Sequence, residues 1–152
     1  MTGKPILQGK AGYQVREVIL HTSATNGDWH DGKTVDQMRA EIDRWHRVDR
    51  GWRKIGYHAV IAPDGSFAQG RAFTEIGAHV AERNRGTIGI CMIPVATILK
   101  MGNFEDFYTP AQRSAVRNLI KTLPGILWVT GHNDYAPKLC PGFKVQDADW
   151  LP

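Results

Sequence analysis

The sequence has little cysteine and no long apolar segment. Only Cys91 and Cys140 occur among its 152 residues, too few for a small secreted domain held by several disulfides. No apolar segment approaches the roughly 20 residues that a membrane-spanning helix needs. The first residues also lack the apolar stretch, about 7 to 15 residues long, of a secretory signal. These absences favour a chain made in the cytoplasm without a signal peptide and without membrane insertion.

Repeats, low-complexity segments and linkers are also missing, which favours one domain over residues 1–152. The net charge is +4 and the isoelectric point is about 9.2, so an anionic partner such as a cell wall is favoured. The densest basic stretch, residues 44–54, is interrupted by Asp49. Because no nucleic-acid-binding motif accompanies these charges, binding to nucleic acid is not expected.

Short apolar stretches alternate with turn-forming residues. Strands are predicted at residues 15–20, 87–94 and 126–132, and residues 57–71 predict a hairpin with its turn at Pro63–Gly65. Helices are predicted between these strands. The order is strand, helix, hairpin, strand, helix, strand, which predicts an α/β fold with a central mixed sheet covered by helices.

Both helices have clear amino-terminal signals. Thr34 and Gln37 fit a capping box ahead of apolar residues at three- and four-residue spacing. Thr109 and Gln112 fit a second capping box, and Pro110 suits the first helical position. We therefore expect helices to begin directly after Thr34 and Thr109.

Two histidines and one cysteine form a candidate metal site. His21 and His132 stand where predicted strands run into loops, a common place for sites in α/β sheets. With Cys140 they would give a tetrahedral zinc three protein ligands and one open position, which is typical of catalytic zinc. Two alternatives stay open: Cys140 as an ordinary buried thiol, or as a nucleophile with His132 as its base. Pro141 weakens the second, because proline lacks the backbone N–H often used in an oxyanion hole.

Four motifs, in order, carry a family resemblance. They are "ILHTSAT" (19–25), "GYHAVIAPDGSFAQGR" (56–71), "IGAHVAERNRGTIGICM" (76–92) and "GHNDYAPKLCPGF" (131–143). Together they resemble the type 2 N-acetylmuramoyl-L-alanine amidases, the family of zinc amidases and peptidoglycan-recognition proteins. Within it the likeness is greatest to the small phage amidases called endolysins. The match runs from about residue 16 to the end of the chain.

The resemblance implies the zinc amidase fold and one Zn²⁺ per chain, held by His21, His132 and Cys140. It also implies that Tyr57 and Lys138 complete the catalytic set. A lysine can stabilise the oxyanion of a tetrahedral intermediate, and a tyrosine can orient water or assist proton transfer. Which of the two is the main acid or base stays open.

Three further residues fall in matching motifs and are candidates for substrate binding. His79 is expected either to contact the substrate or to support the metal site. Arg71 and Asn84 are expected to bind or frame the stem peptide, although structural hydrogen bonds suit them equally. His58 is interpreted as structural, His30 as a solvated loop residue, and His46 as a residue at the surface or edge of the first predicted helix.

The implied activity is hydrolysis of the amide between the lactyl group of N-acetylmuramic acid and L-alanine of the peptidoglycan stem. A phage or prophage endolysin would reach the wall after another protein permeabilises the membrane. The chain is expected to act as a monomer on peptidoglycan. Two alternatives stay open, a non-catalytic peptidoglycan-recognition module and a cytosolic amidase that recycles anhydromuropeptides. Some phage amidases also bind an RNA polymerase, so a regulatory protein partner is left open.

Overall fold

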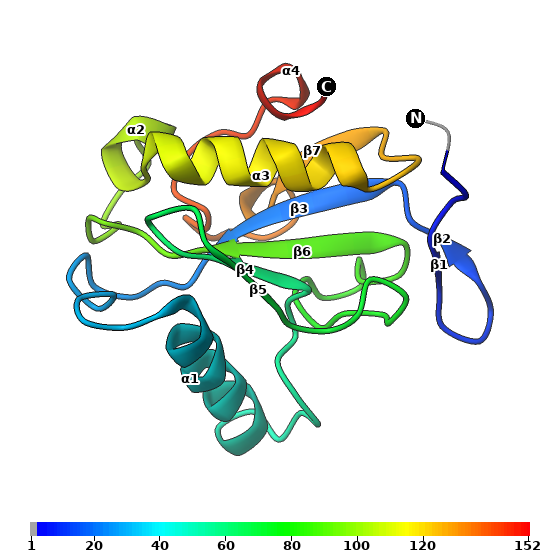
Figure 1. Cartoon of the computed structure of the whole chain (residues 1–152), viewed down its shortest axis with the longest axis horizontal. Helices are drawn as coiled ribbons and strands as arrows, with labels where there is room; N and C mark the ends of the chain where they lie inside the picture. Colours follow the sequence, from blue (N-terminus) through cyan, green and yellow to red (C-terminus); the bar gives the residue numbers. More distant parts are fainter. Residues whose placement is uncertain (1–2) are drawn as a thin grey trace.

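A five-stranded mixed sheet forms the centre of the computed structural model, which describes residues 3–152 (Figure 1). The strands are β3 (Glu17–Thr22), β4 (Ala59–Ile61), β5 (Phe67–Gln69), β6 (Thr87–Met92) and β7 (Trp128–Gly131). Their order is β5-β4-β6-β3-β7. All neighbouring pairs are parallel except β4 and β5, which form the predicted hairpin. The α/β prediction is confirmed.

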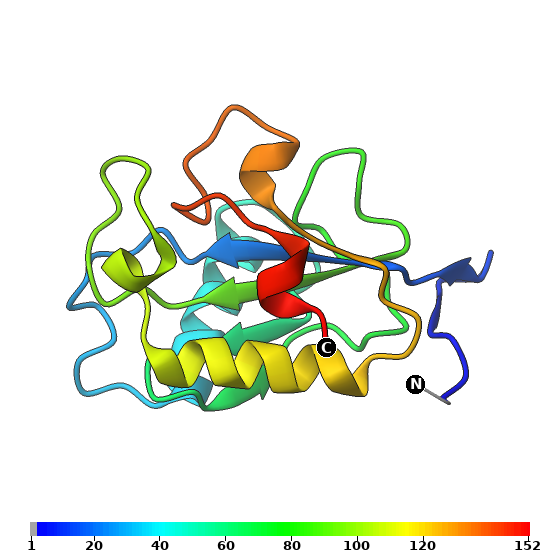
Figure 2. The ribbon, with the colours of Figure 1, turned by 90° about the horizontal axis from the view of Figure 1, so that it is seen from above.

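Helices lie on both faces of this sheet. They are α1 (Val35–Val48), α2 (Phe104–Phe107), α3 (Pro110–Thr122), the 3-10 helix η1 (His132–Asp134) and α4 (Asp147–Trp150). Helix α3 runs along one face and α1 lies on the other, while α4 is on the α3 side (Figures 1 and 2). A small hairpin of β1 (Leu7–Gln8) and β2 (Tyr13–Gln14) stands apart from the sheet. Among the described helices, none has the length and apolar character needed to cross a membrane.

The alternation of side chains along each strand divides the core in two. Val18 and Leu20 of β3 belong to the larger apolar cluster, which includes the buried side of α3. Val60 and Cys91 belong to the smaller cluster, where Met38 of α1 is buried. Because side chains alternate between the faces of a strand, Glu17 and Ile19 of β3 face the α1 side. That face also carries His21.

Both capping boxes form as predicted. The backbone N–H of Gln37 donates to Oγ1 of Thr34 at 3.1 Å, and Gln112 donates to Thr109 in the same way at 3.1 Å. Pro110 occupies the first turn of α3. The side chain of Gln112 goes further, because its buried amide also donates to the backbone carbonyl of Ile93 at 2.7 Å. Helix α3 is thereby tied to the end of β6.

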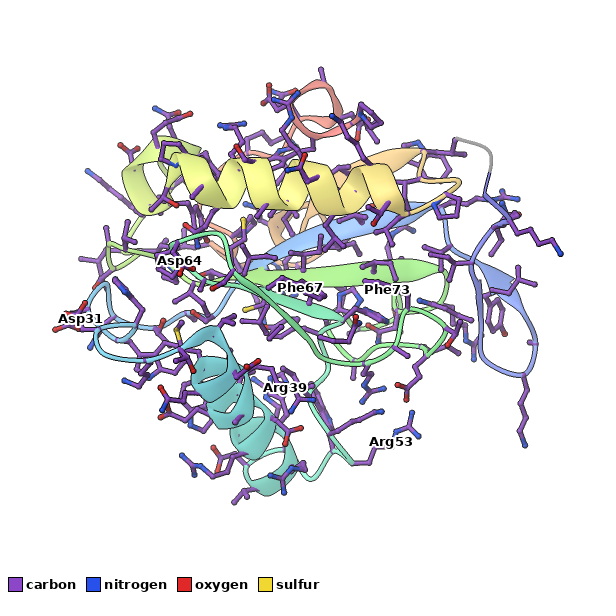
Figure 3. The ribbon with its side chains drawn as sticks, viewed as in Figure 1. Asp31, Arg39, Arg53, Asp64, Phe67 and Phe73 are labelled. Carbon is purple, nitrogen blue, oxygen red and sulfur yellow. The ribbon has the colours of Figure 1, made fainter. Side chains whose placement is uncertain are left out.

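Helix α1 is tied to the sheet by polar contacts as well as by its apolar face. Figure 3 shows Arg39 reaching from α1 toward β5, where its Nε donates to the carbonyl of Gln69 at 2.9 Å. After the helix, Arg53 forms an ion pair with Glu75 at 3.1 Å. These contacts fix α1 to β5, and the loop after α1 to the segment that carries Glu75.

Several sequence boundaries were wrong. The first strand of the sheet is Glu17–Thr22 instead of 15–20, because its ladder with β6 begins at Glu17 and includes His21. The last strand ends at Gly131, and His132 opens η1 instead of ending the strand. The short helix α2 and the β1–β2 hairpin were not predicted. Short elements of this kind depend on long-range pairing that local patterns do not encode.

Candidate metal centre

The parallel arrangement of β3 and β7 brings the three predicted ligands together. His21 is the penultimate residue of β3, and His132 directly follows β7, its neighbour in the sheet. Cys140 lies in the loop after η1. One donor atom from each of these residues lies within 4.8 Å of the other two. The carboxyl ends of two adjacent parallel strands and the loop that follows β7 therefore bring the three candidate ligands together.

Backbone hydrogen bonds hold the loop that supplies two of these donors. The N–H of Asn133 donates to the carbonyl of Cys140 at 2.8 Å, which brings the residue after His132 against Cys140. The hydroxyl of Tyr108 donates to the carbonyl of Pro141 at 2.7 Å. Hydrogen bonds of the loop itself therefore help to bring Cys140 back toward His132 across the eight-residue spacing.

The donor set fits a zinc ion. Sγ of Cys140 lies 3.8 Å from Nδ1 of His21, and tetrahedral zinc with ordinary Zn–N and Zn–S bonds would separate such atoms by about 3.6 Å. The backbone N–H of Thr22 donates to the same Sγ at 3.3 Å, a contact that would stabilise a thiolate. Two imidazoles and one sulfur leave one of four positions open.

The electrostatics of the site favour neutral imidazoles. Burial, followed by the neighbouring His79 and His132, holds the pKa of His21 well below its ordinary value. Burial and then the Lys138 charge lower the pKa of His132. A neutral imidazole keeps the lone pair that a metal needs. Both histidines are therefore in the protonation state of ligands at neutral pH.

Cys140 differs from a reactive cysteine nucleophile. Burial raises the pKa of its thiol to about 11, although the N–H of Thr22 and the Lys138 charge act in the opposite direction. Nucleophilic cysteines have a lowered pKa, so that the thiolate is present at neutral pH. Without a metal this thiol is protonated, and a metal would displace its proton. The geometry therefore favours a ligand over a nucleophile.

Tyr57 and Lys138 lie beside the cluster. The ring of Tyr57 is 5.0 Å from the ring of His21, measured between centroids. Burial, and then the proximity of Cys91 and Cys140, raises the pKa of Tyr57 well above 10, so its hydroxyl keeps its proton. Lys138 is exposed in the loop between His132 and Cys140. A neutral phenol and a cationic amine thus flank the three donors.

The structure engages the polar groups of the other three candidates with the protein itself. His79 is buried, and its Nδ1 lies 2.9 Å from Nε2 of His21. Arg71 donates to the backbone carbonyls of Ile55 and Ile76 at 2.9 and 2.7 Å. The side-chain oxygen of Asn84 accepts from the N–H of His79 at 2.8 Å. Their geometry is that of a frame around the site, and their predicted role in substrate binding stays a prediction.

The remaining histidines also have structural contacts. Nδ1 of His58 accepts from the N–H of Gly89 at 3.0 Å, as expected for a structural residue. His46 was expected at the surface or edge of its helix; it is half-buried, and its Nδ1 accepts from the N–H of Gly56 at 2.9 Å. This contact arises because the loop after α1 folds back onto the helix, which the helix pattern alone does not show.

Sequence reasoning missed Glu17, a buried carboxylate on the same face of β3 as His21. Its oxygens accept hydrogen bonds from Arg83 at 3.1 Å and from Thr130 at 2.6 Å. Tyr135, in the loop between His132 and Cys140, also donates to it. The period-two spacing of Glu17 and His21 was the available signal, because it places both on one face of the strand.

A hollow of about 670 Å³ opens next to Glu17. Its lining includes Arg16, Arg83, Arg85 and the half-exposed indole of Trp128. Because Glu17 and His21 are four residues apart on one strand, this hollow lies about 13 Å along β3 from the metal cluster. The hollow thus lies at the amino ends of β3, β6 and β7, whereas the cluster lies at the carboxyl ends of β3 and β7.

Comparisons with known proteins agree with the predicted family. Residues 11–143 match the family described as N-acetylmuramoyl-L-alanine amidase, Amidase_2. The endolysin of Klebsiella phage KP32 is 36% identical over 138 residues, which cover 88% of this chain and 84% of that protein.

Solved structures agree as well. The N-acetylmuramoyl-L-alanine amidase LysC from Clostridium intestinale has a TM-score of 0.68 at 25% identity, over 93% of this chain and 86% of the other. The Drosophila protein PGRP-LB has a TM-score of 0.70 at 25% identity, over 92% and 82%. The resemblance seen in the four motifs is confirmed. This chain belongs to the N-acetylmuramoyl-L-alanine amidase family.

Proposed function

We propose that this chain is a zinc-dependent amidase that cleaves the bond between the lactyl group of N-acetylmuramic acid and L-alanine of the stem peptide. The observation that carries the proposal is the convergence of His21, His132 and Cys140 at the carboxyl ends of β3 and β7. Zinc, when bound, supplies Lewis acidity that polarises the scissile carbonyl and activates water near neutral pH.

Lys138 would stabilise the negative charge that develops on the carbonyl oxygen. It is an exposed cation within the loop that joins two of the donors. A fixed positive charge aimed at a developing oxyanion contributes much of the rate enhancement in such reactions. Its charge reaches the cluster, because it contributes to lowering the pKa of His132.

Tyr57 would orient the attacking water. Its hydroxyl is protonated at neutral pH, because burial raises its pKa. A protonated phenol donates a hydrogen bond and passes on a proton more readily than it removes one. We therefore assign Tyr57 to orientation and proton donation, with its ring held beside His21.

The stem peptide would extend from the metal cluster toward the hollow beside Glu17. An extended peptide advances about 3.3 Å per residue, so three to four residues span the roughly 13 Å between them. The hollow is lined by Arg16, Arg83 and Arg85 against the two carboxylates of Glu17 and Glu82, so positive charge is in excess and suits a peptide with acidic groups. We propose the bacterial wall as the substrate and host-cell lysis as the setting, reached after the membrane is breached.

The decisive experiment measures release of L-alanine amino termini from purified peptidoglycan. The zinc-loaded protein, the chelated protein and Cys140→Ala are compared, with Cys91→Ala as a matched control, because Cys91 is paired with His21 in the sheet but is not one of the three clustered donors. We expect activity only with zinc and with Cys140 present.

Three other outcomes would replace the proposal. Wall binding without release of amino termini would make the chain a recognition module. Activity that survives zinc removal but not Cys140→Ala would indicate a cysteine nucleophile. Turnover of soluble anhydromuropeptides without turnover of intact sacculi would indicate recycling in place of lysis.

A further inference from the structure

A chain of hydrogen bonds leads from His21 away from the metal cluster. Nε2 of His21 lies 2.9 Å from Nδ1 of His79, and Nε2 of His79 lies 3.2 Å from Oγ1 of Thr87. The Thr87 hydroxyl lies 3.0 Å from the carbonyl oxygens of both Arg83 and Asn84. The side chains of His21, His79 and Thr87 are all buried. The hydrogen bonds from His21 to the carbonyls of Arg83 and Asn84 are therefore shielded from solvent.

The two carbonyls determine the direction of this chain. A carbonyl oxygen can only accept, so the single hydrogen of the Thr87 hydroxyl is donated to these carbonyl oxygens. Oγ1 of Thr87 is then the acceptor for an N–H on Nε2 of His79. In its neutral form His79 has a bare Nδ1, which accepts an N–H from Nε2 of His21. The remaining ring nitrogen of His21, Nδ1, keeps its lone pair.

That lone pair points at the cluster. Nδ1 of His21 is the atom that lies 3.8 Å from Sγ of Cys140. We propose that Thr87 and His79 are positioning residues that hold His21 in the tautomer with Nε2 protonated and Nδ1 free for the metal. The proposal deepens the proposed function and rests on it for the identity of the metal. Outer partners of this kind orient a histidine ligand and raise its basicity.

The surroundings of His79 are shaped to hold its ring in this position. A Cβ on Gly89 of β6 would come within 2.6 Å of the ring, and a Cβ on Gly77 within 2.7 Å. Asn84 accepts from the backbone N–H groups of both His79 and Val80, at 2.8 and 2.9 Å. Two glycines thus leave room for the ring, and an amide holds the backbone beneath it. A residue that only filled space would not need such a cradle on two sides.

The test uses two substitutions of one residue. Thr87→Val keeps the shape but cannot accept from His79, whereas Thr87→Ser keeps the hydroxyl. The first measurement is the tautomer of His21 in the metal-free protein, from ¹⁵N chemical shifts of the imidazole nitrogens. We expect Nε2–H in the wild type and in Thr87→Ser, and a population with Nδ1–H in Thr87→Val. A wild-type His21 protonated on Nδ1 would overturn the proposal.

The second measurement is zinc affinity by competition with a chelator. Loss of an outer partner of a metal ligand typically weakens binding by 10- to 100-fold, so we expect at least a roughly tenfold loss in Thr87→Val. Thr87→Ser is expected to bind like the wild type. Thermal unfolding of both variants shows whether each is folded. Wild-type zinc affinity in a folded Thr87→Val would refute the proposal that Thr87 and His79 position His21.

The two proposals fail in different ways. If the wild type binds zinc and has the expected tautomer but releases no amino termini, the proposed function is wrong and the positioning of His21 by Thr87 and His79 is supported. If the wild type cleaves peptidoglycan with zinc, and Thr87→Val has the wild-type tautomer and zinc affinity, the positioning proposal is wrong and the proposed function is supported. If the wild type binds no zinc, the proposed function is wrong. The tautomer of His21 in the metal-free protein is then the single test of the positioning proposal.

Discussion

The carboxylate of Glu17 accepts a hydrogen bond from the hydroxyl of Tyr135, which lies 118 positions later in the chain. Glu17 begins β3, and Tyr135 lies in the loop between His132 and Cys140. The same carboxylate is also bound by Thr130 of β7. The amino end of β3 is thereby linked to the loop that supplies two donors at its carboxyl end.

Glu17→Gln is expected to destabilise the fold. The amide loses the charge that pairs with Arg83, and its NH₂ group faces hydroxyl and guanidinium donors in place of an acceptor. Breaking a buried charge-assisted bond costs about 1–3 kcal/mol in the free energy of unfolding. Urea denaturation measures this change. Glu82→Gln, at an exposed position on the rim of the same hollow, is the control, and equal stability of the two variants would contradict the role of Glu17.

His58 is expected to make stability fall in acid. Burial lowers its pKa to about 4 in the folded protein, against an ordinary value of 6.5. Between these values the unfolded chain binds a proton that the folded chain does not, so the free energy of unfolding rises with pH. The contribution of His58 is complete above pH 6.5 and is lost as the pH falls toward 4. The loss from this residue is about 3 kcal/mol.

Urea denaturation at several pH values measures this dependence. In His58→Gln the slope of the unfolding free energy against pH is expected to decrease by close to one proton over this range. The slope is the informative quantity, because the variant also loses the hydrogen bonds of His58 to Gly89 and Glu75 at every pH. An unchanged slope would contradict the assignment.

Lys138→Met is expected to lower kcat by about 10²- to 10³-fold, the usual effect of losing one group that stabilises an oxyanion. Zinc affinity should be retained, since the three candidate ligands are His21, His132 and Cys140. Lys144→Met is a matched control, because Lys144 is an exposed cation of the neighbouring segment paired with Asp134 at 2.7 Å. Steady-state release of amino termini measures both variants, and an equal effect would argue for bulk charge over a local role.

Zinc is expected to stabilise the fold through the cluster. A ligand that binds only the folded state at 100 times its Kd adds about 2.7 kcal/mol to the free energy of unfolding. The wild type and Cys91→Ala should show this increase, and Cys140→Ala should lose most of it. Urea denaturation with zinc and with chelator measures the difference. An increase of the same size in Cys140→Ala would place the metal elsewhere.

The sequence alone determined much of the local structure. The boxes at Thr34 and Thr109 form because each bond joins residues three positions apart, and such contacts are present in the local pattern. The hairpin with its turn at Pro63–Gly65 forms for the same reason. The three candidate ligands were predicted through motifs, since each lies in a short stretch of recognisable composition.

Only the tertiary structure decided how these pieces meet. His79 lies against His21 across 58 positions, and Glu17 against Tyr135 across 118. Such contacts depend on the order and register of parallel strands, which are joined by long crossovers and not by local turns. Strand β3 lies between β6 and β7, and this placement, which no single stretch of sequence encodes, brings the loops that carry His79 and Cys140 to the same histidine.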